Sequence, residues 1–220
     1  MVSLEELVSG IADAHKRLDS LERSLDDLKR IKRVNLHLQH GKLSSAALKT
    51  VPSDYYSWSL AQRASVLGCK IPHLCKTIIM ENIACINSGN EDPLNSRYYC
   101  VVLQYNSKLD SEQLRRFVRD SIPEADRPAK KKFNFQHAPE KVSEELTGFQ
   151  HNGVSTFGTK TRVPVIVSGA IADLKPSFIW LGGGAELIKL RISVQDLVQA
   201  LKARVAVGIT ALRTGLDLAY

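Results

Sequence analysis

The sequence predicts a mixed α/β protein, in which a curved, largely antiparallel sheet is flanked by helices and preceded by a long N-terminal helix. Three observations support this prediction. Apolar residues recur every three or four positions from residue 4 to residue 28, strand-like apolar runs alternate with capped helical segments, and no regular βαβ series is present. A chain of 220 residues with 44% hydrophobic content suits one domain and an added segment.

The N-terminal helix is predicted by an unbroken heptad pattern. Its a and d positions are all apolar: Leu4, Leu7, Ile11, Ala14, Leu18, Leu21, Leu25 and Leu28. A helix over these residues would be about 37 Å long. Its narrow stripe suits a coiled-coil partner better than a core, although a helix folded back on its own domain is the alternative. We expect residues 1–38 to form this docking or self-associating helix and 39–53, which lack periodicity, to form a linker.

Residues 54–220 are predicted to form the domain. A helix at 59–68 has Ser59 and Gln62 as a capping box and Gly68 as its end. Strands at 73–80 and 98–105 follow, separated by the turn-forming stretch NSGNEDP. The later predicted elements are helices at 110–120, 139–147 and 193–203 and strands at 163–168, 177–181 and 186–191.

Composition excludes several classes of protein and site. The four cysteines form no CxxC pair, so we expect reduced thiols, no zinc site and a cytoplasmic location. The N-terminus matches neither a signal peptide nor a transit peptide, and no apolar run is long enough to predict a membrane span. The sequence also lacks the phosphate-binding GxxxxGK[ST], the nucleophile motif GxSxG and the zinc motif HExxH, so no cofactor or metal is predicted.

The charge distribution favours a polyanionic partner. Residues 1–40 contain equal numbers of basic and acidic residues, so the formal surplus of +7 lies in residues 41–220. The one dense basic run, RPAKKKF at 127–133, contains Lys130, Lys131 and Lys132. Such a run is either a solvated loop or a phosphate-contacting loop.

One lysine and two glycine-bearing loops are the candidate site. Lys76 interrupts the apolar run HLCKTIIM, where it would be either a ligand-facing cation or a lysine in an internal ion pair or at a strand end. Its neighbour Cys75 would face the opposite way, into the core. The loop GFQHNGVSTFG (148–158) has the composition of a binding loop, whereas WLGGGAE (180–186) suits either a binding loop or a tight hairpin.

Read in order, the blocks HLCKTIIM, YYCVVLQY, GVSTFG, VPVIVS and IWLGGGAELIKLRIS resemble the YbaK/EbsC-like family of prolyl-tRNA editing domains. The resemblance covers roughly residues 54–208 and implies the family's mixed, curved sheet. It also implies that Lys76 is the residue most needed for activity. The substrate-binding residues that it implies are Gly153, Val154, Ser155, Thr156, Phe157 and Gly158 in one loop and Gly182, Gly183 and Gly184 in the other.

The resemblance implies hydrolysis, in trans, of the ester between a wrong amino acid and its tRNA. The reaction would use a substrate hydroxyl or water and no metal, and small residues such as alanine, serine or cysteine are the expected targets. Implied partners are the tRNA acceptor end and, through the N-terminal helix, a synthetase, a multisynthetase complex or a second copy. Thr156 replaces the family's proline, which leaves open an inactive tRNA-binding scaffold; hydrolysis of another acyl ester is a third alternative.

Overall fold

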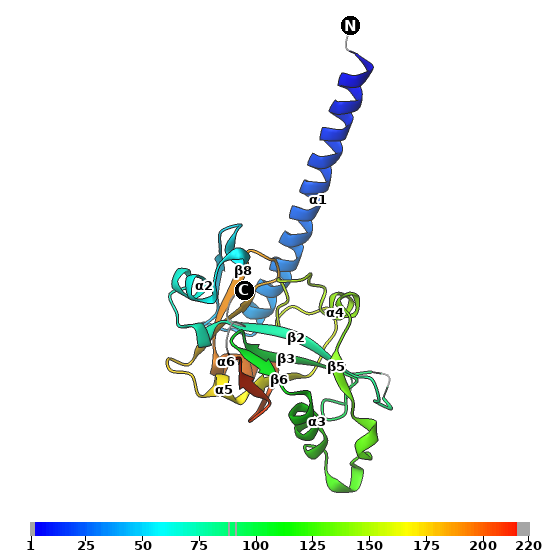
Figure 1. The fold of residues 1–220 in the computed structure, drawn as a ribbon, viewed down its shortest axis with the longest axis vertical. Helices are drawn as coiled ribbons and strands as arrows, with labels where there is room; N and C mark the ends of the chain where they lie inside the picture. The colour runs from blue at the N-terminus through cyan, green and yellow to red at the C-terminus, as the bar shows by residue number, and fades with distance from the viewer. Residues whose placement is uncertain (1–2, 88, 91, 215–220) are drawn as a thin grey trace.

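The computed structural model describes residues 3–87, 89–90 and 92–214 and shows a body of sheets and helices from which one long helix projects (Figure 1). This helix, α1 (Leu4–His40), confirms the predicted N-terminal helix. It begins at Ser3, whose hydroxyl accepts a hydrogen bond from the Glu6 backbone N–H, while the Glu6 carboxylate accepts one from the Ser3 N–H. Two backbone donors that the first turn leaves unpaired are thereby satisfied.

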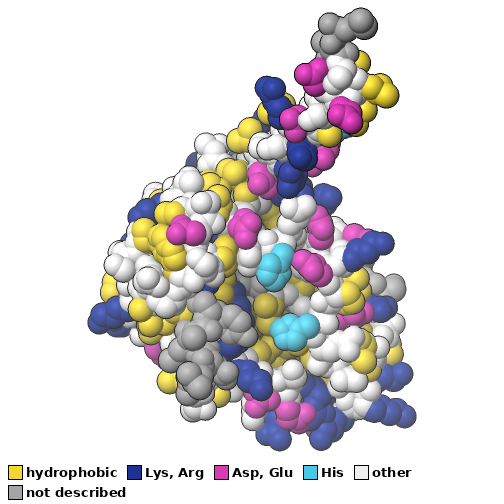
Figure 2. All heavy atoms as spheres, turned by 45° about the horizontal axis from the view of Figure 1, so that its top comes forward, with side chains coloured by type: hydrophobic (Ala, Val, Ile, Leu, Met, Phe, Trp, Pro, Cys, Tyr) yellow, Lys and Arg dark blue, Asp and Glu magenta, His cyan; other side chains and the backbone are white. Residues whose placement is uncertain are grey.

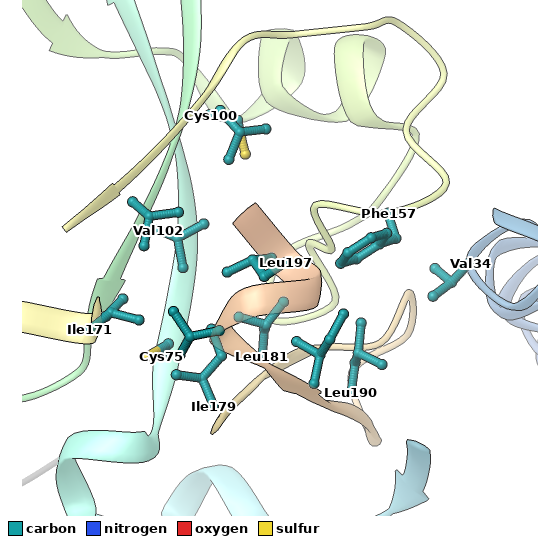
Figure 3. Close-up of a cluster of buried hydrophobic side chains, with 14 of the residues drawn as sticks. Val34, Cys75, Cys100, Val102, Phe157, Ile171, Ile179, Leu181, Leu190 and Leu197 are labelled. Atoms are coloured by element: carbon teal, nitrogen blue, oxygen red, sulfur yellow. The ribbon is translucent and has the colours of Figure 1, made fainter. Parts of the chain in front are cut away.

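Helix α1 has an uncovered part and a packed part. The predicted seam is solvent-exposed in this chain, with Leu4 at 77%, Leu21 at 68% and Leu28 at 63% of their accessible areas. Val34 and Leu38, in contrast, are buried in the main hydrophobic core. Figure 3 shows Val34 extending from α1 toward Phe157 and Leu190. The last turns of α1 are thus part of the body's core.

A five-stranded mixed sheet forms the centre of the body, in the order β5-β2-β3-β6-β9. Strands β5 and β2 and strands β2 and β3 pair antiparallel, whereas β3 with β6 and β6 with β9 pair parallel. The strands are β2 (Cys75–Asn82), β3 (Tyr98–Gln104), β5 (Phe135–His137), β6 (Val165–Ser168) and β9 (Arg204–Ala206). The mixed α/β class predicted from the sequence is confirmed.

Two smaller sheets complete the body. A three-stranded antiparallel sheet has the order β1-β8-β7 and contains β1 (Ala47–Thr50), β7 (Phe178–Gly182) and β8 (Ile188–Ser193). A two-stranded ribbon pairs β4 (Ser107–Leu109) with β10 (Thr210–Leu212). Strand β1 lies within residues 39–53, so part of the segment predicted as a linker belongs to a sheet.

Four of the described helices of the body agree with the sequence predictions in place and type, whereas the short helix α5 (Gly169–Ala172) was not predicted. Helix α2 starts at the Ser59–Gln62 capping box, and Gly68 follows it with φ +66°. Gly148 ends α4 with φ +72°, the left-handed conformation that glycine adopts without strain. The described helices are α2 (Leu60–Val66), α3 (Ser111–Asp120), α4 (Glu140–Thr147), α5 (Gly169–Ala172) and α6 (Val194–Leu201), with 3-10 turns η1 (Tyr55–Ser57), η2 (Ile71–His73), η3 (Glu124–Asp126) and η4 (Lys130–Lys132).

The central sheet is buried on both faces. Along β3, Cys100 and Val102 belong to the cluster that also contains Val34, whereas Tyr99, Val101 and Leu103 belong to a second cluster under α3. Successive side chains on a strand point to opposite faces, so a strand covered on both sides is apolar throughout. This explains why YYCVVLQY shows no alternation of apolar and polar residues.

Candidate functional site

A cavity of about 610 Å³ opens beside strand β2. None of the helices in the described part of the chain has the length and apolar character needed to cross a membrane. The cavity wall combines apolar and polar side chains from η1, α2, β2, α4 and the loop before β6. The residues that line the cavity include Tyr56, Arg63, Lys76, Tyr105, His137, Glu140, His151, Asn152, Val154, Gly182 and Arg213.

The open edge of β2 forms one wall of the cavity. Strand β2 pairs with β3 from Cys75 to Glu81, but with β5 only from Met80 to Asn82. The first half of β2 therefore has its edge beside the cavity, and Cys75 through Ile79 all line it. Cys75 is also a core residue, as predicted, and its burial raises the pKa of the thiol well above the ordinary value. The thiol is protonated at neutral pH and is a poor nucleophile.

Lys76 places a half-buried cation in this wall. Its Nζ lies 5.8 Å from the centroid of the Tyr105 ring, a cation–π distance. No carboxylate among the described residues lies within salt-bridge distance of it, so the internal ion pair that the sequence left open is not formed there. Burial lowers the Lys76 pKa, and the positive charge of Arg213 lowers it further. A negatively charged ligand in the cavity would raise the Lys76 pKa and so oppose the effect of Arg213.

The two glycine-bearing loops pack backbone against backbone. A Cβ added to Gly182 would lie 2.2 Å from the Val154 carbonyl oxygen, and one added to Gly153 would lie 3.1 Å from the Ala185 backbone. The Gly184 N–H donates a hydrogen bond of 3.0 Å to the Gly153 carbonyl. Only glycine allows so close an approach. The loops predicted separately from the sequence therefore form one unit. Its members that line the cavity are Phe149, His151, Asn152, Val154 and Gly182.

Most backbone donors of these loops are already bonded inside the protein. The N–H groups of Gly153 and Gly184 donate to loop carbonyls, and Gly183 donates to Ile188. In the same way Phe157 donates to the Ser155 hydroxyl and Gly158 donates to Nδ1 of His37. Of the six predicted residues 153–158, Val154 is the one that lines the cavity. Val154 is accordingly the residue of this set that a ligand in the cavity would contact.

Residues 155–158 anchor the loop to the core instead. Ser155, Thr156 and Phe157 are all buried, and the Phe157 ring packs edge-on against His37 of α1 with centroids 5.3 Å apart. Gly158 has φ +72°, and a Cβ there would meet the backbone of Arg33 at 2.7 Å. Thr156 Oγ1 is buried and has no hydrogen-bond partner among the described residues. The packed part of α1 therefore holds the far side of this loop.

A buried polar cluster that was not predicted from the sequence includes two residues of the cavity wall, Tyr56 and Arg63. Tyr56 donates a hydrogen bond of 2.8 Å to the Asn152 carbonyl, and Lys189 donates one to the Tyr56 hydroxyl. Arg63, 3% exposed, lies over the Tyr56 ring and donates to the Tyr56 and Trp58 carbonyls. Burial lowers the Lys189 pKa to about 7. The alternation in IKLRIS gave no sign that Lys189 would point inward.

The predicted basic run lies apart from this site. Lys130, Lys131 and Lys132 form the turn η4, and none of them lines the cavity. On the face shown in Figure 2, histidine side chains flank a hollow in which hydrophobic side chains are visible. His137 and His151 are cavity residues, and His151 Nδ1 is 3.8 Å from the Glu140 carboxylate. No three histidine, cysteine or acidic side chains among the described residues are grouped as metal ligands.

Comparison with solved structures shows the fold. A candidate trans-editing enzyme for prolyl-tRNA synthetase superposes with a TM-score of 0.62 at 18% identity, over 84% of this chain and 98% of that one. A scaffold protein from epitope grafting by computational design also gives 0.62, at 17% identity over 85% and 98% of the two chains. A hypothetical protein gives 0.60, at 21% identity over 81% and 99%.

These likenesses extend to the architecture and no further. No protein-family model matches the chain, and no curated protein matches it in sequence. Identities of 17–21% leave the residues of the site to be judged by their own geometry. The class that fold and site define is a mixed α/β protein with a cation-lined cavity at the open edge of its central sheet.

Proposed function

We propose that the protein hydrolyses the aminoacyl ester of mischarged tRNA in trans. The observation that carries this proposal is Lys76, a half-buried cation in the cavity wall without a carboxylate partner among the described residues. The fold shared with a candidate trans-editing enzyme for prolyl-tRNA synthetase supports the substrate class. A cavity of about 610 Å³ is within the ordinary range for a small-molecule site and suits an aminoacylated terminal nucleoside.

The reaction requires few catalytic groups from the protein. An aminoacyl ester is already activated, so a water molecule, held by a free hydroxyl of the substrate ribose, can attack its carbonyl carbon. The bond to the ribose oxygen then breaks, and that oxygen takes up the proton that the water loses, which gives the free amino acid and the uncharged tRNA. In the proposed complex Lys76 stabilises the substrate's negative charge, and the Val154 N–H donates to the ester carbonyl as its oxygen becomes an anion. Each such preorganised donor contributes about 3 kcal/mol, or about a hundredfold in rate. The glycine packing beneath Val154 fixes the position of that donor.

The test is deacylation of tRNAs charged with alanine, serine, cysteine or proline by the purified full chain. We expect turnover of one mischarged species carrying a small amino acid, because the walls contributed by Tyr56, Phe149 and Val154 limit the space for a side chain. The matched control is the same tRNA correctly charged. Failure to hydrolyse any aminoacyl-tRNA, including a wider panel, would contradict the proposal.

A second function, a tRNA-binding scaffold of a synthetase assembly, is favoured by the uncovered seam of α1. Exposed leucines at successive a and d positions are typical of a helix that associates with another helix. The two functions are compatible in one chain, since α1 projects away from the body that holds the cavity (Figure 1). A scaffold alone would bind tRNA or synthetase without turnover. Lys130, Lys131 and Lys132 remain proposed contacts to the tRNA backbone.

A further inference from the structure

A second hollow continues from the cavity toward the ribbon β4–β10. Its volume is about 300 Å³, and it shares Lys76, Ile78, His137 and Arg213 with the cavity wall. Lys108 of β4 lines the second hollow but not the first. Because four residues belong to both, the two hollows are neighbouring parts of one surface depression. We call the second hollow the basic groove.

The ribbon fixes the position of the two cations that border the groove. Across the ribbon Lys108 pairs with Ala211, which lies two residues before Arg213 in the chain. The Arg213 N–H donates to the Asn106 carbonyl over 2.9 Å, and its Nε lies 3.3 Å from the Ser107 carbonyl. The backbone and the guanidinium of Arg213 are thus both held against residues 106–107, at the start of β4.

The described residues that line the groove include three cations, Lys76, Lys108 and Arg213, and one histidine, His137, but no acidic residue. Burial and the charge of Arg213 both lower the Lys76 pKa, which shows that the cations disfavour one another. Like charges gathered in a concave site raise the local concentration of anions. A bound anion would offset the mutual repulsion.

The shape of the groove selects among anions. The apolar residues Ile78, Leu103 and Leu109 also line the groove. It adjoins the larger cavity at Lys76, which lines both. A single phosphate ion would occupy one point of such a depression, whereas a polynucleotide strand would occupy the groove and the cavity together. A cationic groove that tracks the backbone is the general solution for single-stranded nucleic acid.

We propose that the basic groove, lined by Lys76, Lys108, His137 and Arg213, binds phosphodiester groups of a single-stranded RNA 3′ end whose last nucleoside lies in the cavity. The inference rests on the proposed function and deepens it, because the strand that enters the groove would carry the ester to Lys76. It assigns a binding role to the ribbon β4–β10, whose strands the sequence analysis did not predict.

The test is fluorescence anisotropy with the full chain and a labelled, uncharged RNA microhelix that ends in single-stranded CCA. Binding is measured at several salt concentrations. We expect Lys108→Ala and Arg213→Ala each to weaken binding and to lower the slope of log affinity against log salt by about one. Lys16→Ala, which removes an equally positive but distant side chain of α1, serves as the matched control and should change neither. Circular dichroism checks that the variants are folded.

Three outcomes would overturn the inference: Lys108→Ala and Arg213→Ala that bind like the wild-type chain, a microhelix without its CCA end that binds equally well, or no binding of the microhelix at all. Inorganic phosphate that displaces RNA completely at equal phosphate concentration would also overturn it, by showing a site for the free ion. Because the probe carries no ester, groove-dependent binding without any deacylase activity would contradict the proposed function alone.

Discussion

The Lys189 ammonium donates a hydrogen bond to the hydroxyl of Tyr56 and lies 4.4 Å from the centroid of the same ring. Lys189 is 5% exposed, and it also donates a hydrogen bond to the Glu186 carbonyl. Tyr56 in turn donates to the Asn152 carbonyl, two residues before Val154. A buried cation thus supports the loop that lines the cavity, at an electrostatic cost that depends on pH.

Lys189 should make the stability of the protein depend on pH. Burial lowers its folded pKa from 10.5 to about 7, with Glu186 opposing and Arg63 reinforcing the shift. Between these two values the unfolded chain binds more protons than the folded chain, so this residue makes the free energy of unfolding rise with pH. The free energy of unfolding of the wild-type chain, relative to that of Lys189→Met, should therefore rise over about 2.5 pH units from pH 7 to pH 9.5. Urea unfolding at each pH measures this difference.

Exposed Lys16 provides the control for this pH effect. The difference in unfolding free energy between the wild-type chain and Lys16→Met should stay constant over the same pH range, because the Lys16 side chain is 80% exposed. A wild-type minus Lys189→Met difference that stayed constant across the pH range would show that the Lys189 pKa is not lowered in the folded state.

Gly182→Ala should loosen the unit formed by the two glycine loops. The new Cβ would lie 2.2 Å from the Val154 carbonyl oxygen, and the overlap should cost about 1–3 kcal/mol of unfolding free energy. Hydrogen exchange of the Gly184 N–H, which donates to Gly153, should accelerate. Gly68→Ala is the comparison: a Cβ there meets open space, so only the positive φ is unfavourable and Gly184 should stay protected. Equal exchange in both variants would argue against close loop packing.

Thr156→Val should stabilise the protein by about 1 kcal/mol, because Thr156 Oγ1 is buried without a hydrogen-bond partner among the described residues. Valine has nearly the same shape. Thr147→Val should have the opposite effect, since Thr147 Oγ1 donates to the Ser143 carbonyl and accepts from the Phe149 N–H. Chemical denaturation measures the unfolding free energy of both variants. A Thr156→Val chain less stable than the wild type would contradict this prediction and imply a hydrogen-bond partner for the Thr156 hydroxyl.

Two truncations should separate the parts of α1. Removal of residues 1–25 takes away most of the uncovered seam, so association through the seam, with a second copy or another protein, should disappear while the melting temperature stays unchanged. Removal through residue 38 also deletes Val34 and Leu38 from the core and should lower the melting temperature. Sedimentation and thermal unfolding measure the two effects. Unaltered association after the shorter truncation would refute the role of the seam.

Long elements with strong local signals were predictable from the sequence. The capping box at Ser59, the left-handed Gly148 and the apolar run of β3 each specify their structure through nearby residues. Strands β1, β4, β5, β9 and β10 were not predicted, because their formation depends on distant partners. Strand β1, for example, has four largely exposed residues and exists through its pairing with β8, from Ala47 opposite Arg191 to Thr50 opposite Ile188.

The site was predictable where one residue contradicted its surroundings. Lys76 stands out because it interrupts an apolar run, and the structure places it in a cavity wall. Lys189 occupies an alternating strand where a lysine is expected to face solvent, yet it is buried and donates hydrogen bonds to the Tyr56 hydroxyl of η1 and to the Glu186 carbonyl. The pairing of β4 with β10 likewise brings Arg213 and Lys108 to the basic groove. No local sequence pattern predicts this pairing.

The most direct test of the central claim compares single-turnover deacylation by the wild-type chain and by Lys76→Ala on the mischarged tRNA that the wild type hydrolyses fastest. Lys76→Arg, which keeps the charge, is the matched variant. We predict that Lys76→Ala lowers the rate by about a hundredfold or more, with less loss in Lys76→Arg and unchanged folding. Equal rates for wild type and Lys76→Ala would contradict the assignment of Lys76 to the active site.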